Sequence, residues 1–142
     1  LGLYGEDKDD KNLIMELLNW MQKNKVDYTN TFIFLMNKKI KDPEAYNNAD
    51  FDLWKIKWVK RLTMFNNSHD KSMELMNSTN PMVIPRNHKV EEALTLANNG
   101  DLTLFNKLIG ILKNPYLVNS NDLKFMSPAE HSDKKYQTFC GT

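Results

Sequence analysis

The sequence is short of the features that mark membrane, secreted and nucleic-acid-binding proteins. It has 142 residues with 1 cysteine and 5 glycines, and its 19 basic and 18 acidic residues nearly balance. The two signs are interspersed from Glu6 to Lys135, so no basic stripe marks a nucleic-acid site. No apolar run approaches the roughly 20 residues of a membrane-spanning helix, and the N-terminus lacks the layout of a signal peptide. We therefore expect a soluble, cytoplasmic protein with no nucleic-acid or membrane partner.

Residue types that carry catalysis are also scarce. The histidines His69, His88 and His131 are far apart and have no cysteine or histidine companions at metal-ligand spacing. No glycine-rich loop followed by a lysine predicts a phosphate-binding site. The carboxylate pairs Asp9-Asp10 and Asp50/Asp52 fall where helices should begin, and there they stabilise the helix dipole. The residue types alone predict no catalytic, cofactor-binding or metal-binding residue.

The single cysteine, Cys140, lies third from the end of the chain. Without a second cysteine it cannot form a disulfide within the chain. A reactive thiol needs a nearby cation, histidine or helix N-terminus to lower its pKa, and the neighbours Phe139 and Gly141 supply none. The residues alone favour an inert thiol over a functional one.

The length suits a single domain, which would bury roughly two-thirds of its unfolded surface. The chain begins with Leu1 rather than methionine and runs into a glycine-punctuated, acidic segment. We therefore expect a piece of a longer protein.

Apolar residues recur at helical spacing, often behind a residue that can cap a helix, and this pattern predicts an all-α fold of about five helices. No window alternates apolar and polar residues long enough to favour a sheet. Four helices are predicted before residue 80. The first runs from Asp9 or Asp10 to about Asn24, and a second, shorter one follows the capping cluster 27–31. The third begins at about Asp50, and the fourth lies around 71–76.

The clearest supersecondary signal is an αα-hairpin at about 87–114. Asn87 can cap its first helix, Gly100 can provide a left-handed C-cap, and Asp101 can cap its second helix. Two amphipathic helices joined by so short a turn bury their apolar stripes against each other. Beyond Tyr116 the periodicity stops. We therefore divide the chain into a helical domain at 1–116 and an extended C-terminal arm at 117–142 that carries Cys140.

Two tryptophans, Trp54 and Trp58, form an apolar ridge on the helix that begins near Asp50. Core packing is the favoured interpretation, because aromatic side chains carry much of the energy of cores. Binding of a ligand or partner on the ridge is the alternative. The basic residues beside it, Arg61 among them, are interpreted as a solvated face.

Several motifs stand in order along the chain, and together they resemble the selenoprotein O family, known in bacteria as YdiU. The final motif ends in Cys-Gly-Thr, whereas Cys-Ser-Ser is usual in that family, but the cysteine stays in place. The matching stretches are Leu1-Gly2-Leu3, 27–32, Trp54 with Trp58 and Arg61, 80–88, Glu92-Ala93-Leu94, Gly100-Asp101, Asn114-Pro115-Tyr116 and 138–142.

The resemblance implies a parent protein with a protein-kinase-like fold that transfers AMP from ATP, with Mg or Mn, to hydroxyl side chains of protein substrates. Its catalytic residues would lie upstream of Leu1. This chain would be a helical and regulatory C-terminal portion whose partners are the upstream kinase-like lobes. The family's C-terminal cysteine is associated with redox control through a disulfide to the kinase-like part, which makes Cys140 a regulatory candidate. The alternative function is a non-catalytic helical interaction module that binds a partner through the Trp54/Trp58 ridge.

Overall fold

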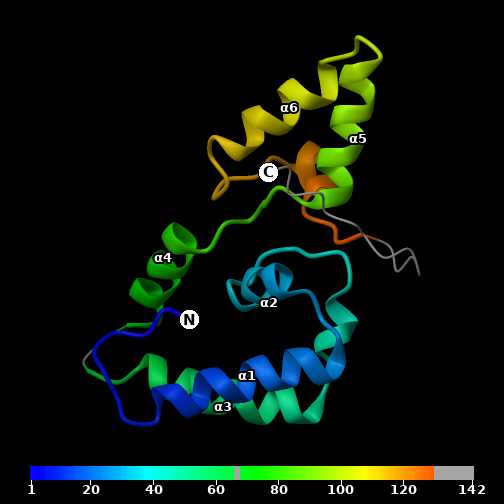
Figure 1. Ribbon diagram of the computed structural model, residues 1–142. Coiled ribbons are helices and arrows are strands. Elements are labelled where there is room, and N and C mark those ends of the chain that lie inside the picture. Colours follow the sequence, from blue (N-terminus) through cyan, green and yellow to red (C-terminus); the bar gives the residue numbers. More distant parts are fainter. Residues whose placement is uncertain (66–67, 130–142) are drawn as a thin grey trace, which may run out of the picture.

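The computed structural model describes residues 1–65 and 68–129, which form six α-helices and two short 3₁₀-helices joined by loops (Figure 1). No strand occurs among these residues, so the all-α prediction is confirmed, and each of the six α-helices overlaps a stretch that was predicted to be helical. None of the described helices is long and apolar enough to cross a membrane. The elements are α1 (Asp10–Asn24), α2 (Tyr28–Leu35), η1 (Pro43–Tyr46), α3 (Ala49–Leu62), α4 (His69–Thr79), α5 (Asn87–Asn98), α6 (Thr103–Leu112) and η2 (Ser120–Phe125).

Helices α1 and α3 lie side by side and form one end of the molecule in Figure 1. Between them, and under α2 and η1, lies a cluster of aromatic rings. The ring centroids of Trp20 and Phe51 are 4.5 Å apart, and those of Phe34 and Tyr46 are 4.2 Å apart. Such ring pairs stabilise a core beyond the area that they bury. This cluster joins all four elements in one core.

Side-chain caps account for where two of these helices begin. The Asp27 carboxylate accepts a hydrogen bond from the Asn30 N–H at the start of α2, at 2.8 Å. Asn48 Oδ1 accepts hydrogen bonds from two N–H groups in the first turn of α3. Each cap satisfies donors that have no partner inside the helix.

The cap predicted for α1 is wrong. Asp9 occupies the capping position but makes no side-chain cap bond, and Asp10 accepts a hydrogen bond from the Asp7 N–H, which precedes the helix. Asp10 is engaged instead by Arg61, whose guanidinium donates to both of its carboxylate oxygens at 2.7 and 2.9 Å. A tertiary ion pair has therefore replaced the local cap.

Helices α5 and α6 pack against each other and confirm the predicted hairpin (Figure 1). Gly100 has a φ of +89°, a conformation that favours glycine. The Asp101 carboxylate accepts from the Thr103 N–H at 2.8 Å, although the capping position of α6 falls on Leu102 and not on Asp101. Asn87, however, is the first helical residue and not the cap. The capping position falls on Arg86, whose side chain turns away to pair with Asp27 at 2.8 Å.

Two further hydrogen bonds stabilise the root of the hairpin, where residues 82–86 lead into α5 and residues 113–115 follow α6. The N–H groups of Met82 and Val83 both donate to the Pro115 carbonyl, at 2.8 and 3.2 Å.

In the segment predicted as an extended arm, η2 forms a helical turn that the periodicity did not reveal, and Phe125 and Met126 at its end are buried. The start of the arm is thus packed on the helical body.

Candidate functional site

The residue singled out as a regulatory candidate, Cys140, lies outside the described residues, as does His131. His69 begins α4 and His88 lies in the first turn of α5. Burial, together with the nearby charges of Lys89 and Arg86, lowers the pKa of His88 below its ordinary value. Within residues 1–65 and 68–129 no three His, Cys, Asp or Glu side chains come close enough together to hold a metal ion.

The tryptophan ridge is part of the core. Trp54 and Trp58 are 3% and 2% exposed, and their rings stack with centroids 5.9 Å apart. The Trp54 indole N–H donates to the Leu13 carbonyl at 2.8 Å, so even its polar edge is satisfied inside the protein. Core packing is confirmed, and the idea that this ridge binds a partner is wrong for this structure.

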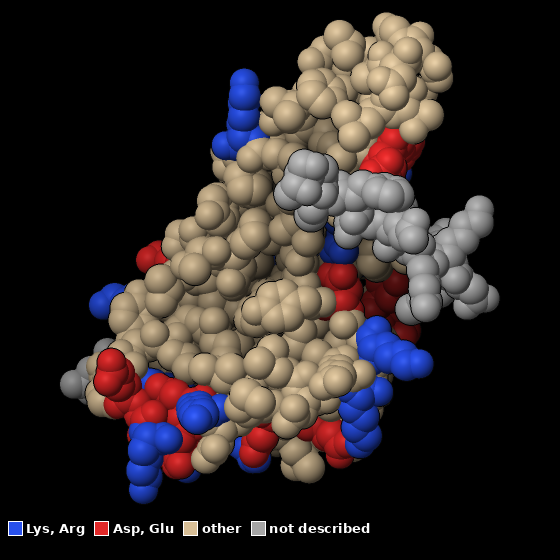
Figure 2. All heavy atoms as spheres, viewed as in Figure 1, with Lys and Arg blue, Asp and Glu red and all other residues tan. Residues whose placement is uncertain are grey.

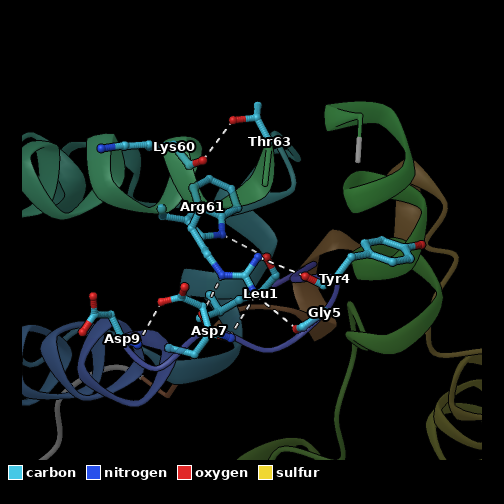
Figure 3. A network of polar contacts seen from close by, with 10 residues as sticks. Leu1, Tyr4, Gly5, Asp7, Asp9, Lys60, Arg61 and Thr63 are labelled. Carbon is cyan, nitrogen blue, oxygen red and sulfur yellow. Dashed lines mark hydrogen bonds and ion pairs between the residues drawn. The ribbon is translucent and has the colours of Figure 1, made fainter. Parts of the chain in front are cut away.

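Arg61 lies at the centre of a polar network and not on a solvated face, which corrects the sequence-based interpretation. It is 5% exposed, and its guanidinium donates to the carbonyls of Tyr4 and Gly5 at 3.0 and 3.1 Å as well as to Asp10 (Figure 3). The hydrogen bond from Arg61 holds the pKa of the Asp10 carboxyl below its usual value. A guanidinium fork is suited to bridging several acceptors at once. Arg61 therefore clamps the N-terminal segment onto α1 and α3.

Two more contacts fix the first residues of the chain. The Trp58 indole N–H donates to the Leu1 carbonyl at 2.9 Å. Gly2 is buried against α4 with a φ of +70°, and a Cβ there would lie 2.7 Å from the Ser72 carbonyl oxygen. Only glycine permits so close an approach of the two backbones. The N-terminal segment is thus held between α3 and α4.

An open apolar groove of about 760 Å³ lies where this segment meets three helices. In Figure 2 the face between α4, α2 and α1 is uncharged and hollowed, whereas charged side chains gather at the edge formed by α1 and α3. The groove is lined by Leu1, Gly2 and Leu3, by Ile14, Leu17 and Leu18 of α1, by Tyr28, Thr29 and Phe32 of α2, by Leu75, Met76 and Thr79 of α4, and by Asn80, Pro81 and Ile84.

The groove was not predicted, although α1 carried a signal for it. Leu13, Leu17 and Met21 are spaced four apart and are buried in the core. Ile14 and Leu18 form the next row around the helix, and Ile14 is 41% exposed. A stripe wider than one neighbouring helix can cover indicates a second contact surface. The groove has the chemistry to bind an apolar segment, since no Asp, Glu, His, Lys, Arg or Cys side chain of the described residues lines it.

Comparison with known proteins relates the chain to one family. The sequence model of the family described as protein adenylyltransferase SelO matches residues 1–113. Over all 142 residues the chain is 80% identical to a protein nucleotidyltransferase YdiU of Pelagibacter ubique and 42% identical to one of Clostridium beijerinckii. A third, from Nitrosococcus oceani, is 40% identical over 143 aligned positions. In each case the whole chain is matched, yet it spans only 29% of the relative's length.

Proposed function

Because the chain belongs to the SelO family of protein adenylyltransferases, we propose that it is the C-terminal helical portion of a longer enzyme. That enzyme transfers AMP from ATP to hydroxyl side chains of protein substrates. The observation that carries the proposal is the full-length match, at 80% identity, to a nucleotidyltransferase of which this chain spans 29%. The other 71% of such a protein is long enough to contain the kinase-like lobes. We expect those lobes, as part of the same protein, to be the partners that this chain contacts.

The apolar groove does not fit ATP or its metal. A nucleotide triphosphate needs cationic or backbone N–H groups around its phosphates and carboxylates around Mg²⁺ or Mn²⁺. The described residues contain no metal-binding cluster, and the groove is lined by uncharged side chains. The proposal therefore assigns the catalytic groups to the part of the enzyme upstream of Leu1.

Radiolabelled ATP provides the test. We expect the full-length parent protein, supplied with ATP labelled in its α-phosphate, Mg²⁺ or Mn²⁺ and a mixture of proteins, to attach the label covalently to protein. The chain 1–142 alone should attach none. Label transferred by the isolated chain would show that the catalytic groups were assigned to the wrong part, and a full-length protein that transfers no nucleotide would overturn the activity.

A regulatory role for Cys140 is the finer part of the proposal, and it follows from the place of the cysteine in the family's terminal motif. A disulfide from Cys140 to the upstream part would close a long loop and restrain the arm by a few kcal/mol. In reducing compartments such disulfides are usually transient, which suits a switch.

The disulfide is tested by mass spectrometry of the full-length protein with and without reductant. We expect a Cys140-linked peptide pair only without reductant, and we expect AMP transfer by the Cys140→Ser variant to be indifferent to the redox state. Detection of Cys140 only as a free thiol, with the same activity in both states, would remove the switch and leave the family assignment intact.

A further inference from the structure

Large apolar side chains from two helices are exposed to solvent in the apolar groove. Ile14 of α1 is 41% exposed and Tyr28 of α2 is 61% exposed, although both are large and apolar in most of their surface. The Tyr28 ring packs on that of Phe32 with centroids 4.9 Å apart, so the two rings form one wall of the groove. No charged side chain lines the groove in the described part of the chain. A contiguous apolar surface of this kind marks an interaction site for an apolar partner.

The position of Leu1 shows which part of a longer protein is best placed to be that partner. Leu1 lies in the wall of the groove, and its carbonyl is held by the Trp58 indole. Gly2 is wedged against the α4 backbone, and Arg61 fastens Tyr4 and Gly5 behind it. The backbone therefore cannot swing away from the groove without breaking several contacts. Any residue joined to the nitrogen of Leu1 starts its path at this groove.

The surroundings of that nitrogen support the same direction. Burial lowers the pKa of the Leu1 α-amino group below its ordinary value, because a charge is poorly solvated among apolar side chains. A peptide bond at this place would carry no charge and would avoid that penalty.

We propose that the apolar groove is the docking site of the segment that directly precedes Leu1 in the longer protein, and that this segment is apolar where it crosses the groove. The inference rests on the proposed function in taking the chain as the C-terminal portion of a longer protein. The relatives have ample sequence for it, since the chain spans 29% of their length. A covalently attached segment also has a higher effective concentration at the groove than a second copy of the chain.

Two neighbouring residues at the end of α4 allow a matched test. Thr79 lines the groove and Ser78 does not, both are exposed, and the hydroxyl of each donates to the Leu75 carbonyl. In the chain 1–142 we expect Thr79→Cys and Ser78→Cys to react with a maleimide at similar rates. In the full-length protein the Thr79→Cys thiol should react at least about tenfold more slowly, as a covered site does, while the rate for Ser78→Cys stays unchanged. Peptide mass spectrometry reads each site separately from other cysteines.

A second full-length variant identifies the occupant. When a Gly-Ser linker of equal length replaces the segment directly before Leu1, fast labelling of Thr79→Cys should return. Labelling that is already fast in the unaltered full-length protein would overturn the proposal, because the groove would then be open. Labelling that stays slow with the linker would show that another segment covers the groove. Protection of Thr79→Cys in the chain 1–142 that grows with concentration would assign the groove to a second copy.

The outcome is separable from that of the proposed activity, because both are measured on the same full-length protein. Slow labelling of Thr79→Cys in a protein that transfers no AMP would uphold the groove and overturn the activity. Fast labelling in a protein that does transfer AMP would uphold the activity and overturn the groove.

Discussion

The unit formed by α1, α2 and α3 and the hairpin formed by α5 and α6 are both helical, yet they are held together differently. Helix α1 alone buries four side chains, Leu13, Leu17, Trp20 and Met21, whereas α5 and α6 each bury one, Ala93 and Leu108. In Figure 1 the hairpin projects away from the α1–α3 unit. Most of the buried core thus belongs to the α1–α3 unit, and the hairpin contributes few fully buried side chains to it.

The hairpin is attached mainly by directional bonds at its root. The Arg86 guanidinium donates to both oxygens of Asp27 at 2.8 Å, and the Pro115 carbonyl accepts from two N–H groups of the segment before α5. Hydrogen bonds and ion pairs fix an orientation but contribute less free energy than a large apolar core. The α1–α3 unit therefore provides most of the stability of the described part of the chain, and the hairpin depends on the contacts at its root.

The largest expected difference between the two regions is in the free energy of unfolding that is lost when a buried leucine is replaced by alanine. Leu17→Ala in α1, at a side chain 1% exposed, should lower the free energy of unfolding by about 4 kcal/mol, and Leu108→Ala in α6, at a side chain 5% exposed, by about 2 kcal/mol. The cavity at Leu108 can collapse, because its neighbours on the hairpin are only partly packed. Urea unfolding of the chain 1–142, followed by circular dichroism, measures both values. Equal losses would show that the hairpin is as tightly packed as the α1–α3 unit.

The next largest effect tests the clamp inside the α1–α3 unit. Arg61→Met removes the partner of Asp10 and of two backbone carbonyls, and we expect a loss of about 3 kcal/mol because four hydrogen bonds to partly covered acceptors are lost together, two of them to a carboxylate. Lys57→Met is the control, since Lys57 pairs with Glu16 at 2.8 Å on the surface and should cost about 1 kcal/mol or less. Both are read from urea unfolding. A similar loss for the two variants would mean that the clamp is no stronger than a surface ion pair.

The sequence predicted helices well in both regions and predicted their partners poorly. Apolar periodicity placed α1 and the α5–α6 hairpin within a few residues, because local spacing and turn chemistry decide where a helix forms. Arg61, assigned to a solvated face, is buried, since its acceptors come from residues 4–10, about fifty positions earlier. Such a long-range ion pair leaves no mark in helical periodicity.

The candidate site was less predictable than the fold for a related reason. Val59 of α3 is 41% exposed, although its neighbour Trp58 is 2% exposed and both are apolar. Periodicity gives a face of a helix but not which neighbour covers it. The groove is formed by the N-terminal segment and three helices together, so it depends on tertiary packing that no single segment encodes. The resemblance to the family rested on motifs and not on packing, and it is confirmed.

Acid should weaken both regions, by less than the loss of Arg61 because a protonated carboxyl can still accept a hydrogen bond. For Asp27, burial alone would raise the pKa, but the hydrogen bonds from Arg86 and the Asn30 N–H and the Arg86 charge lower it overall, and the pKa of Asp10 is lowered too. The pKa values of both carboxyls are lower in the folded state than the ordinary value of 3.8. The stability that the two charged carboxylates contribute is therefore present above pH 3.8, and it is lost as the pH falls below 3.8 through the folded-state pKa values.

Asparagine variants separate the two carboxylates. Urea unfolding at several pH values should show a flatter acid dependence for Asp10→Asn and for Asp27→Asn than for the unaltered chain. Hydrogen exchange should show that Asp27→Asn loosens the Met82 and Val83 amides at the hairpin root, while Asp10→Asn leaves them protected. An acid profile unchanged by either substitution would show that other groups govern the response to pH.

The smallest effects lie within the hairpin and test whether its turn is set by backbone conformation alone. Nothing lies within 4 Å of a Cβ added at Gly100 or at Gly110, so neither substitution meets a clash. Gly100→Ala should cost about 1 kcal/mol because a φ of +89° strains any residue with a Cβ. Gly110→Ala, in the middle of α6, should instead gain about 0.5–1 kcal/mol because alanine favours the helix. Amide exchange in α5 and α6 measures both changes even where global unfolding is governed by the α1–α3 unit. If both substitutions shifted protection in the same direction, the turn at Gly100 would not have the left-handed conformation that joins the two helices.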